Sequence, residues 1–232
     1  LRAICLLWFL KKKCLRGQKS ANVMLAVFII EMIGTVAFAS SGAMIGIRKN
    51  MDIFGINVLA VTTALGGGLI RDLVLGINPP NMFRNSSYAI ASIITACLLF
   101  LLFRLRQELL ASHLVQVYEK WMNVMDAIGL GAFTVIGIDT ALQAGYESTF
   151  LLLFVGVITG IGGGMIRDIM AGNTPFVFIK HVYACASIAG AVACLILRLF
   201  LGDTLAMVIG AVLVVIIRLL AAHYRWNLPR VQ

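Results

Sequence analysis

Apolar residues in this chain come in blocks of about twenty, the length an α-helix needs to cross a hydrocarbon core roughly 30 Å thick. Backbone groups inside a bilayer must satisfy their own hydrogen bonds, so each block is expected to be a helix. The short alternating segments typical of a β-barrel do not occur. With 61% hydrophobic and 12% charged residues, the composition also excludes an ordinary soluble domain. We therefore predict an all-α integral membrane protein with seven transmembrane helices, at about 24–47, 53–70, 87–103, 123–142, 149–166, 182–200 and 204–222.

The formal charge of +9 indicates orientation in a membrane rather than binding of nucleic acid. Lys and Arg lie mainly in the short segments between apolar blocks, where they decide which side of the membrane a loop occupies. The side reached after the first span carries most of them. We therefore expect a cytoplasmic C-terminus and a first span that starts outside. The basic segment 1–23 opposes this count, and we interpret it as an N-terminal extension ahead of a native start at Met24.

A long-range duplication divides the chain into two similar halves. The segment 63–76 returns as 159–172 at an offset of 96, and Glu31-Met-Ile-Gly34 matches Asp126-Ala-Ile-Gly129 at an offset of 95. Further matches join Phe38 to Phe133, Gly42 to Gly137, Pro79 to Pro175 and Ala91-Ser92 to Ala186-Ser187. Each unit contains three spans, an odd number, so the second copy must enter the membrane from the opposite face. Such an inverted repeat is the architecture of many transporters and some channels.

The duplication predicts a 3+3+1 division of the chain. The expected segments are the extension 1–23, the first three-helix repeat 24–104, a connecting loop or interfacial helix 105–122, the inverted second repeat 123–201, and a seventh helix with a cytoplasmic tail 202–232. Three scattered histidines and five cysteines without metal-ligand spacing predict no metal site and no cofactor. Nothing in this architecture calls for an enzyme, so no catalytic residue is predicted.

Two glycine triplets are the strongest candidates for a permeation path. Each glycine costs roughly 1 kcal/mol in an ordinary helix, so the triplets are expected to bend or break spans two and five. Carbonyls freed at a break must face protein or a water-filled cavity, where a cation or a small zwitterion could shed part of its water. The alternative is close helix packing. The candidate path residues are Gly66, Gly67, Gly68, Gly162, Gly163 and Gly164, with Thr63 and Thr159, whose hydroxyls bond back to the helix or face the path.

Charged residues follow each triplet by about one turn. They are the pairs Arg71-Asp72 and Arg167-Asp168. Ionisable groups at membrane depth are costly and usually paired, so these four either gate a path or pin the bent helix end. Neighbouring residues on a helix do not face each other, so each arginine is expected to find its partner elsewhere.

Three further acidic residues lie within the predicted spans. Glu31 and Asp126 form a matched pair of intramembrane acids, expected to neutralise an arginine or to line the path. Asp139, near the end of span four, has no such counterpart and is expected to reach the headgroups.

At these residues the chain resembles the bacterial members of the trimeric intracellular cation (TRIC) channel family, also described as the glycine-transporter-domain family. The resemblance rests on Glu31-Met-Ile-Gly-Thr-Val-Ala-Phe-Ala-Ser-Ser-Gly-Ala, on Arg48-Lys-Asn-Met-Asp-Ile-Phe-Gly and on the two Gly-Gly-Gly-x-Ile-Arg-Asp-x-x-x-Gly segments. It covers about residues 24–222. The resemblance implies a homotrimer in a bacterial-type plasma (inner) membrane, with one pore per subunit beside glycine-kinked helices two and five. It also implies an outside N-terminus and a cytoplasmic C-terminus.

The sequence is compatible with three functions. The first is a homotrimeric, K⁺-permeable channel, and the second is a secondary carrier of a small amino acid such as glycine. The third is a non-conducting membrane scaffold or lipid-binding protein that uses the glycines only for packing. The expected partners are other copies of the chain, membrane lipids, and permeating K⁺ or a small amino acid, with no nucleic acid.

Overall fold

The computed structural model describes residues 2–105, 113–179, 182–224 and 226, with side chains from residue 23 onward and, after the first gap, from residue 120. All regular structure in these segments is helical. The helices are α1 (Arg2–Arg48), α2 (Ile53–Val74), α3 (Asn81–Arg84), α4 (Ser87–Leu105), α5 (His113–Gln143), α6 (Thr149–Met170), α7 (Phe176–Ile179), α8 (Tyr183–Leu201) and α9 (Asp203–His223). Seven stretches in the described residues are long and apolar enough to cross a membrane: 23–48, 53–74, 87–105, 120–143, 149–170, 183–201 and 203–223. The seven predicted spans are confirmed.

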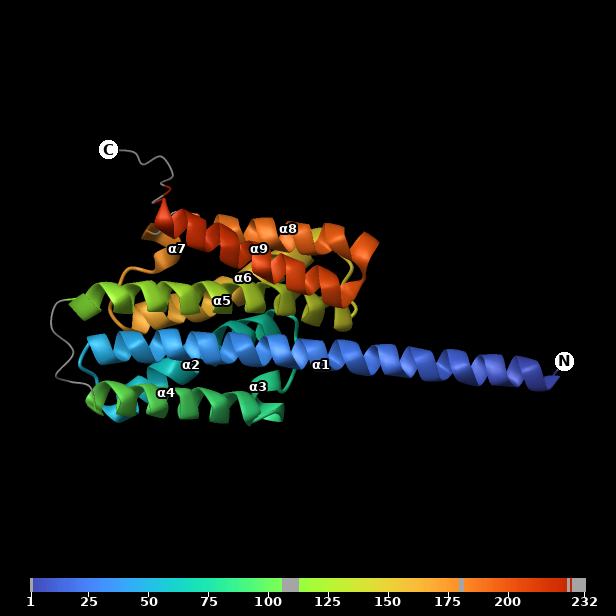
Figure 1. The fold of residues 1–232 in the computed structure, drawn as a ribbon, viewed down its shortest axis with the longest axis horizontal. Helices are drawn as coiled ribbons and strands as arrows, with labels where there is room; N and C mark the ends of the chain where they lie inside the picture. Colours follow the sequence, from blue (N-terminus) through green and yellow to red (C-terminus); the bar gives the residue numbers. More distant parts are fainter. Residues whose placement is uncertain (1, 106–112, 180–181, 225, 227–232) are drawn as a thin grey trace.

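The two three-helix repeats are inverted with respect to each other. α1 and α5 run side by side in opposite directions through the middle of the bundle (Figure 1). α2 and α4 pack on α1, whereas α6 and α8 pack on α5. The short helices α3 and α7 follow α2 and α6, so they occupy corresponding places in the two repeats. α9 has no counterpart and packs on α5 and α8. The chain therefore has the predicted 3+3+1 architecture.

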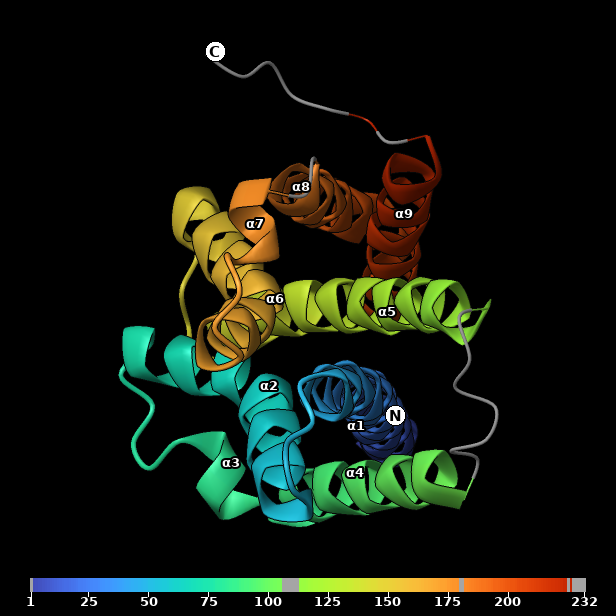
Figure 2. The same cartoon turned by 90° about the vertical axis from the view of Figure 1, so that its left-hand side faces the viewer.

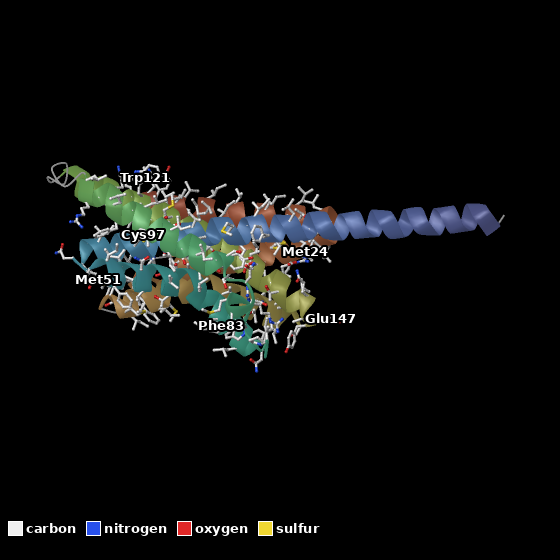
Figure 3. All side chains as sticks on the ribbon, turned by 90° about the horizontal axis from the view of Figure 1, so that it is seen from below. Met24, Met51, Phe83, Cys97, Trp121 and Glu147 are labelled. Carbon is white, nitrogen blue, oxygen red and sulfur yellow. The ribbon has the colours of Figure 1, made fainter. Side chains whose placement is uncertain are left out.

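The outer surface of the bundle is apolar, as a lipid-facing surface must be. Apolar side chains project outward along it (Figure 3), and on α4 alone Ile90, Ile94, Leu98 and Leu102 are exposed. Met51 and Trp121 lie at one end of the bundle, whereas Phe83 and Glu147 lie toward the other (Figure 3). α1 continues beyond this second end, so the segment before Met24 projects from the bundle (Figure 3).

Spans two and five are one turn longer than predicted. α2 continues to Val74 and α6 to Met170, beyond the predicted ends at 70 and 166. The additional turn carries the two Arg-Asp pairs, and their side chains are buried inside the protein. Because the charges are neutralised there, the helices continue past them instead of ending.

The predicted match of Pro79 with Pro175 is wrong by one residue. Pro80 and Pro175 each precede a short helix, and their carbonyl oxygens accept hydrogen bonds at 3.0 Å from the amides of Phe83 and Phe178, respectively. The offset between the repeats therefore changes from 96 to 95 before these prolines. The loop after α2 contains one residue more than the loop after α6, and sequence identity alone had aligned the wrong proline.

Candidate functional site

α2 and α6 cross at the glycine triplets, and their backbones touch there. A Cβ atom added to Gly67 would collide with the carbonyl oxygen of Thr159 and lie 3.2 Å from the amide nitrogen of Gly163. A Cβ added to Gly163 would collide with the carbonyl oxygen of Thr63. Only residues without side chains permit this approach. The two triplets of the inverted repeats therefore meet at the centre of the bundle.

The glycines bend the helices without breaking them. Helical structure runs through both triplets, and neither helix ends at Gly66–Gly68 or Gly162–Gly164. Figure 2 shows that α2 and α6 change direction along their length. The expectation of open carbonyls at a break is therefore wrong for this conformation, because contact between the two helix backbones offsets the poor helix propensity of glycine.

The two threonines before the triplets form hydrogen bonds to the backbones of their own helices. The hydroxyl of Thr63 donates to the carbonyl oxygen of Leu59 and that of Thr159 to the carbonyl oxygen of Val155, each at 2.5 Å. Both side chains are fully buried, and they pack against the glycines that the duplication relates, Gly42 and Gly137. Of the two predicted roles, the structure contains the bond back to the helix.

A pair of phenylalanines fills the space beside the crossing. The rings of Phe38 and Phe133 stack with centroids 5.3 Å apart, and the two residues are 0% and 4% exposed. Phe38 also packs against Gly129 and Gly163. The duplication relates the two rings, although sequence reasoning gave neither of them a role. Aromatic side chains and helix backbones therefore pack closely around the two triplets.

One buried ionic cluster lies beyond the triplet of α2. In this first-repeat cluster (Glu31, Arg71, Asp72, Asn81 and Tyr88), Arg71 Nε donates to Asp72 Oδ1 at 2.8 Å, and Arg71 Nη1 lies 3.9 Å from Glu31 Oε1. The hydroxyl of Tyr88 donates to Glu31 Oε2 at 2.7 Å. The backbone amide of Asn81, the first residue of α3, donates to Asp72 Oδ2 at 2.7 Å. The cluster thus ties together α1, α2, α3 and α4.

An equivalent cluster lies beyond the triplet of α6. In this second-repeat cluster (Ser41, Asp126, Arg167, Asp168 and Phe176), Arg167 Nε donates to Asp168 Oδ1 at 3.0 Å and Nη1 donates to Asp126 Oδ1 at 2.5 Å. Arg167 Nη1 also donates to the hydroxyl of Ser41 on α1. The amide of Phe176, at the start of α7, donates to Asp168 Oδ2 at 2.8 Å, and its ring lies 4.9 Å from the Arg167 guanidinium carbon. Because α2 and α6 run in opposite directions, the two clusters lie toward opposite ends of the bundle (Figure 1).

Each arginine has the partner on another helix that was expected, and it also bonds its own aspartate neighbour, which was not expected. Asp72 and Asp168 are each fixed by the first amide of the following short helix, so the long arginine side chain folds back to reach them. Each arginine also contacts a carboxylate on another helix, Glu31 for Arg71 and Asp126 for Arg167. The four predicted charges and the two predicted acids therefore assemble into two three-charge groups.

Asp139 belongs to a third ionic group and does not reach the headgroups. Its carboxylate accepts from Arg198 Nη2 at 3.2 Å and from the Gln143 amide, and its side chain is only 4% exposed. Arg198 also contacts Asp203 at 2.9 Å. Nothing local in the sequence indicates that α5, α8 and α9 meet at this pair.

Replacing Arg198 by glutamine is expected to lower the free energy of unfolding by about 3 kcal/mol, since the buried Asp139 carboxylate loses its cation. The measurement is thermal unfolding of purified protein in detergent. Asp203→Asn is the control, because Asp203 is 53% exposed and its removal should cost less than about 1 kcal/mol. Equal losses in the two variants would contradict the assignment of Asp139 as a buried ion-pair partner.

Arg218 on α9 is a buried cation for which the sequence pattern indicated no role. The residue is 3% exposed, and its guanidinium carbon lies 4.7 Å from the centroid of the Tyr183 ring. Its Nε and Nη2 atoms have no hydrogen-bond partner among the described residues. Among those residues, no three His, Cys, Asp or Glu side chains gather into a group that could hold a metal ion.

Several known proteins are similar to this chain in sequence. A family model described as "Glycine transporter" matches residues 28–104 and 123–198. A UPF0126 membrane protein of Vibrio cholerae is 37% identical over 97% of this chain and 90% of its own length, and the inner membrane protein YadS of Escherichia coli is 34% identical over 88% and 95%.

Solved structures of similar sequence have the same architecture. A structure described in work on conductance through TRIC cation channels superposes with a TM-score of 0.74 and 34% identity, over 88% of this chain and 96% of that one. A prokaryotic TRIC channel crystallised in 0.5 M KCl gives a TM-score of 0.79 and 27% identity over 88% and 100%. The TRIC trimeric intracellular cation channel orthologue from Rhodobacter sphaeroides gives 0.75 and 29% over 86% and 98%. The chain is a multi-pass membrane protein that belongs to the Glycine transporter family, in which these UPF0126 and TRIC proteins are its relatives.

Proposed function

We propose that this chain forms a homotrimeric channel for monovalent cations, K⁺ among them, with one path in each subunit between α2 and α6. The observation that carries the proposal is the crossing at Gly67 and Gly163, where the inverted repeats bring two helix backbones into contact at the centre of the bundle. Separating the helices at this point would expose backbone carbonyls, the groups that replace the hydration shell of a cation in a pore. The similarity to TRIC cation channels supports this reading.

The two ionic clusters suit the same mechanism. Each fixes the charged end of a glycine-bent helix to the short helix that follows it and to an acid on α1 or α5. A packed element of this kind has discrete arrangements rather than continuous ones. In the proposed channel, the stacked rings of Phe38 and Phe133 and the touching triplets close the path, and opening moves α2 and α6 apart.

The first experiment is reconstitution of the purified full chain. Planar bilayers in K⁺ should show discrete unitary currents, and liposomes containing K⁺ should show flux that does not saturate with substrate. Saturable uptake of labelled glycine with counterflow, without unitary events, would instead make the chain a carrier. The description of the family model as a glycine transporter makes this second candidate worth the parallel assay. The absence of either activity in correctly folded protein would favour the scaffold function.

Gly68 gives a test of the path that does not depend on damaging the fold. A Cβ at Gly68 would meet only Arg71 Nη2, at an ordinary contact distance of 3.8 Å, and the residue is partly exposed. Gly68→Leu is expected to retain the thermal stability of the parent protein and to block most K⁺ flux, whereas Gly68→Ala should conduct. Unchanged flux through a folded Gly68→Leu protein would show that the path does not pass this residue.

The orientation and the trimer are parts of the proposal with their own tests. We propose that the span of α1 starts outside and that the C-terminus is cytoplasmic, because the loops that follow α1 and α4 carry basic residues. Cysteines introduced at Met51 and Glu147 report opposite faces of the bundle (Figure 3), and a membrane-impermeant thiol reagent should label only the second in intact cells. Cross-linking of the protein in membranes should give trimers.

A further inference from the structure

We propose that the two ionic clusters have different roles: the second-repeat cluster is a fixed anchor, with Ser41 and Arg218 as positioning residues, and the Arg71–Glu31 pair is the contact that breaks when α2 and α6 separate. The duplication makes the two halves equivalent in sequence and in fold, yet their charged ends are built differently. The consequence for opening rests on the proposed channel function. The difference between the halves stands on the geometry alone.

The interhelical ion pair is tight in one half and loose in the other. Arg167 Nη1 lies 2.5 Å from Asp126 Oδ1, and both side chains are 0% exposed. Arg71 Nη1 lies 3.9 Å from Glu31 Oε1, and the side chains are 3% and 18% exposed. In addition, Arg71 Nη1 donates no hydrogen bond to any described residue. The Arg71–Glu31 pair is therefore longer and more exposed than the Arg167–Asp126 pair, and it has no hydrogen bond.

The residue types explain this difference. Glu31 is one methylene longer than Asp126, and it directs one carboxylate oxygen to the hydroxyl of Tyr88. The shorter Asp126 places its carboxylate directly on Arg167. Arg167 also has the hydroxyl of Ser41 as an acceptor, whereas the position that the duplication relates to Ser41 is occupied by Ile136, which offers no acceptor.

The glycines nearest the two clusters show the same asymmetry. A Cβ at Gly164 would lie 2.8 Å from the Tyr183 hydroxyl and 3.6 Å from Asp126 Oδ1, so this point is tightly packed. The equivalent Gly68 has only Arg71 Nη2 within 4 Å of such an atom. The charged end of α2 therefore has free space beside it, and the charged end of α6 does not.

α9 adds a charge to one half only. Arg218 lies on the ring of Tyr183, which borders the second-repeat cluster at Gly164. The Tyr183 ring thus separates Arg218 from the second-repeat cluster and links the two. In the first-repeat cluster, Arg71 pairs with Glu31 and Asp72. Because α9 lies outside the duplication, Arg218 adds a buried cation beside the second half without a counterpart beside the first.

Amide hydrogen exchange tests the proposal without reference to conduction, because it measures local opening. In purified protein reconstituted into nanodiscs, backbone amides of 69–75 should exchange faster than those of 165–171. Glu31→Gln should accelerate exchange in 69–75 at least about fivefold, the lower end of typical coupling effects, and leave 165–171 within about twofold. The matched variant Asp126→Asn should instead accelerate both segments together and lower the Tm, because it loosens the anchor of the whole bundle.

Hydrogen exchange in variants of Arg218 tests its proposed positioning role. Arg218→Gln should raise exchange in 165–171 toward the level of 69–75, and Arg218→Lys, which keeps the charge, should restore the asymmetry. In bilayers, Glu31→Gln should raise the open probability at least about fivefold, since it removes a contact of the closed state. Equal exchange at the two helix ends in the parent protein, or an Arg218→Gln protein with unchanged asymmetry, would overturn the inference. Absence of K⁺ currents with the exchange asymmetry intact would instead defeat the proposed channel function alone.

Discussion

Gly67→Ala and Gly163→Ala are each expected to lose both the folded bundle and K⁺ flux. An added Cβ would collide with the carbonyl oxygen of Thr159 or Thr63, and these are backbone atoms that cannot rotate away. Alanine would gain about 1 kcal/mol of helix propensity over glycine. Overpacking typically costs about 1–3 kcal/mol when flexible side chains can yield, so a backbone collision should cost at least about 3 kcal/mol. The collision wins.

The matched control for this prediction is Gly68→Ala, one residue further along the same helix. Apart from the backbone of its own helix, no atom of the described residues lies closer than 3.8 Å to its added Cβ, so helix propensity decides the sign. We expect this variant to be neutral or stabilised by up to about 1 kcal/mol. Thermal unfolding in detergent and the yield of monodisperse protein measure the difference. If Gly67→Ala behaved like Gly68→Ala, the two helix backbones would not be in contact.

Arg167→Gln is expected to cost about 3–5 kcal/mol, because it leaves two carboxylates in the interior without a cation. Asp126 and Asp168 are both fully buried, and Arg167 contacts each of them through a different guanidinium nitrogen. The readout is the fall in Tm of the detergent-solubilised protein, or failure to recover folded protein at all.

Two further variants make the result interpretable. Arg167→Lys keeps the charge but loses the planar fork that reaches Asp168 and Asp126 together, so it should recover only part of the stability. Arg104→Gln removes an exposed arginine at the end of α4 and should change the stability by less than about 0.5 kcal/mol. A Tm for Arg167→Gln close to that of Arg104→Gln would contradict the structural role of the second-repeat cluster.

The two repeats are not fully equivalent. An inverted repeat gives two corresponding helix ends, and identical ends would open with equal ease. The chain departs from equivalence at Glu31 against Asp126, at Ser41 against Ile136, and at Arg218, which has no counterpart. These three positions concentrate the difference at the charged ends and leave the glycine crossing symmetrical.

The candidate site was predictable from the sequence in its membership but not in its geometry. The eight residues proposed for a path and the six charged residues stand out in the sequence because the duplication repeats them and because charges are rare at membrane depth. The sequence left open whether the triplets bend or break their helices. The structure shows continuous helices, and the backbone contact between Gly67 and Thr159 that accompanies them cannot be read from the propensity of a single helix.

Other members of the site left no local signal. Ser41 lies 126 residues from Arg167 in the sequence, and the partner of Asp139, Arg198, lies 59 residues away. Tyr88 and Tyr183 do match in the sequence at an offset of 95. In the structure each of them lies beside the ionic cluster of its own repeat. Arg218 could not, because it lies outside the repeat.

The sequence by itself determined the seven spans, their 3+3+1 order and the inversion, because span length and the odd number of helices per repeat follow from apolar blocks along the chain. Only the tertiary structure decided which backbones touch, which arginine reaches which carboxylate, and that one half is held more tightly than the other. Those outcomes depend on distances between residues tens of positions apart, and on side-chain lengths that differ by a single methylene. The local sequence pattern predicts neither these distances nor the effect of these side-chain lengths.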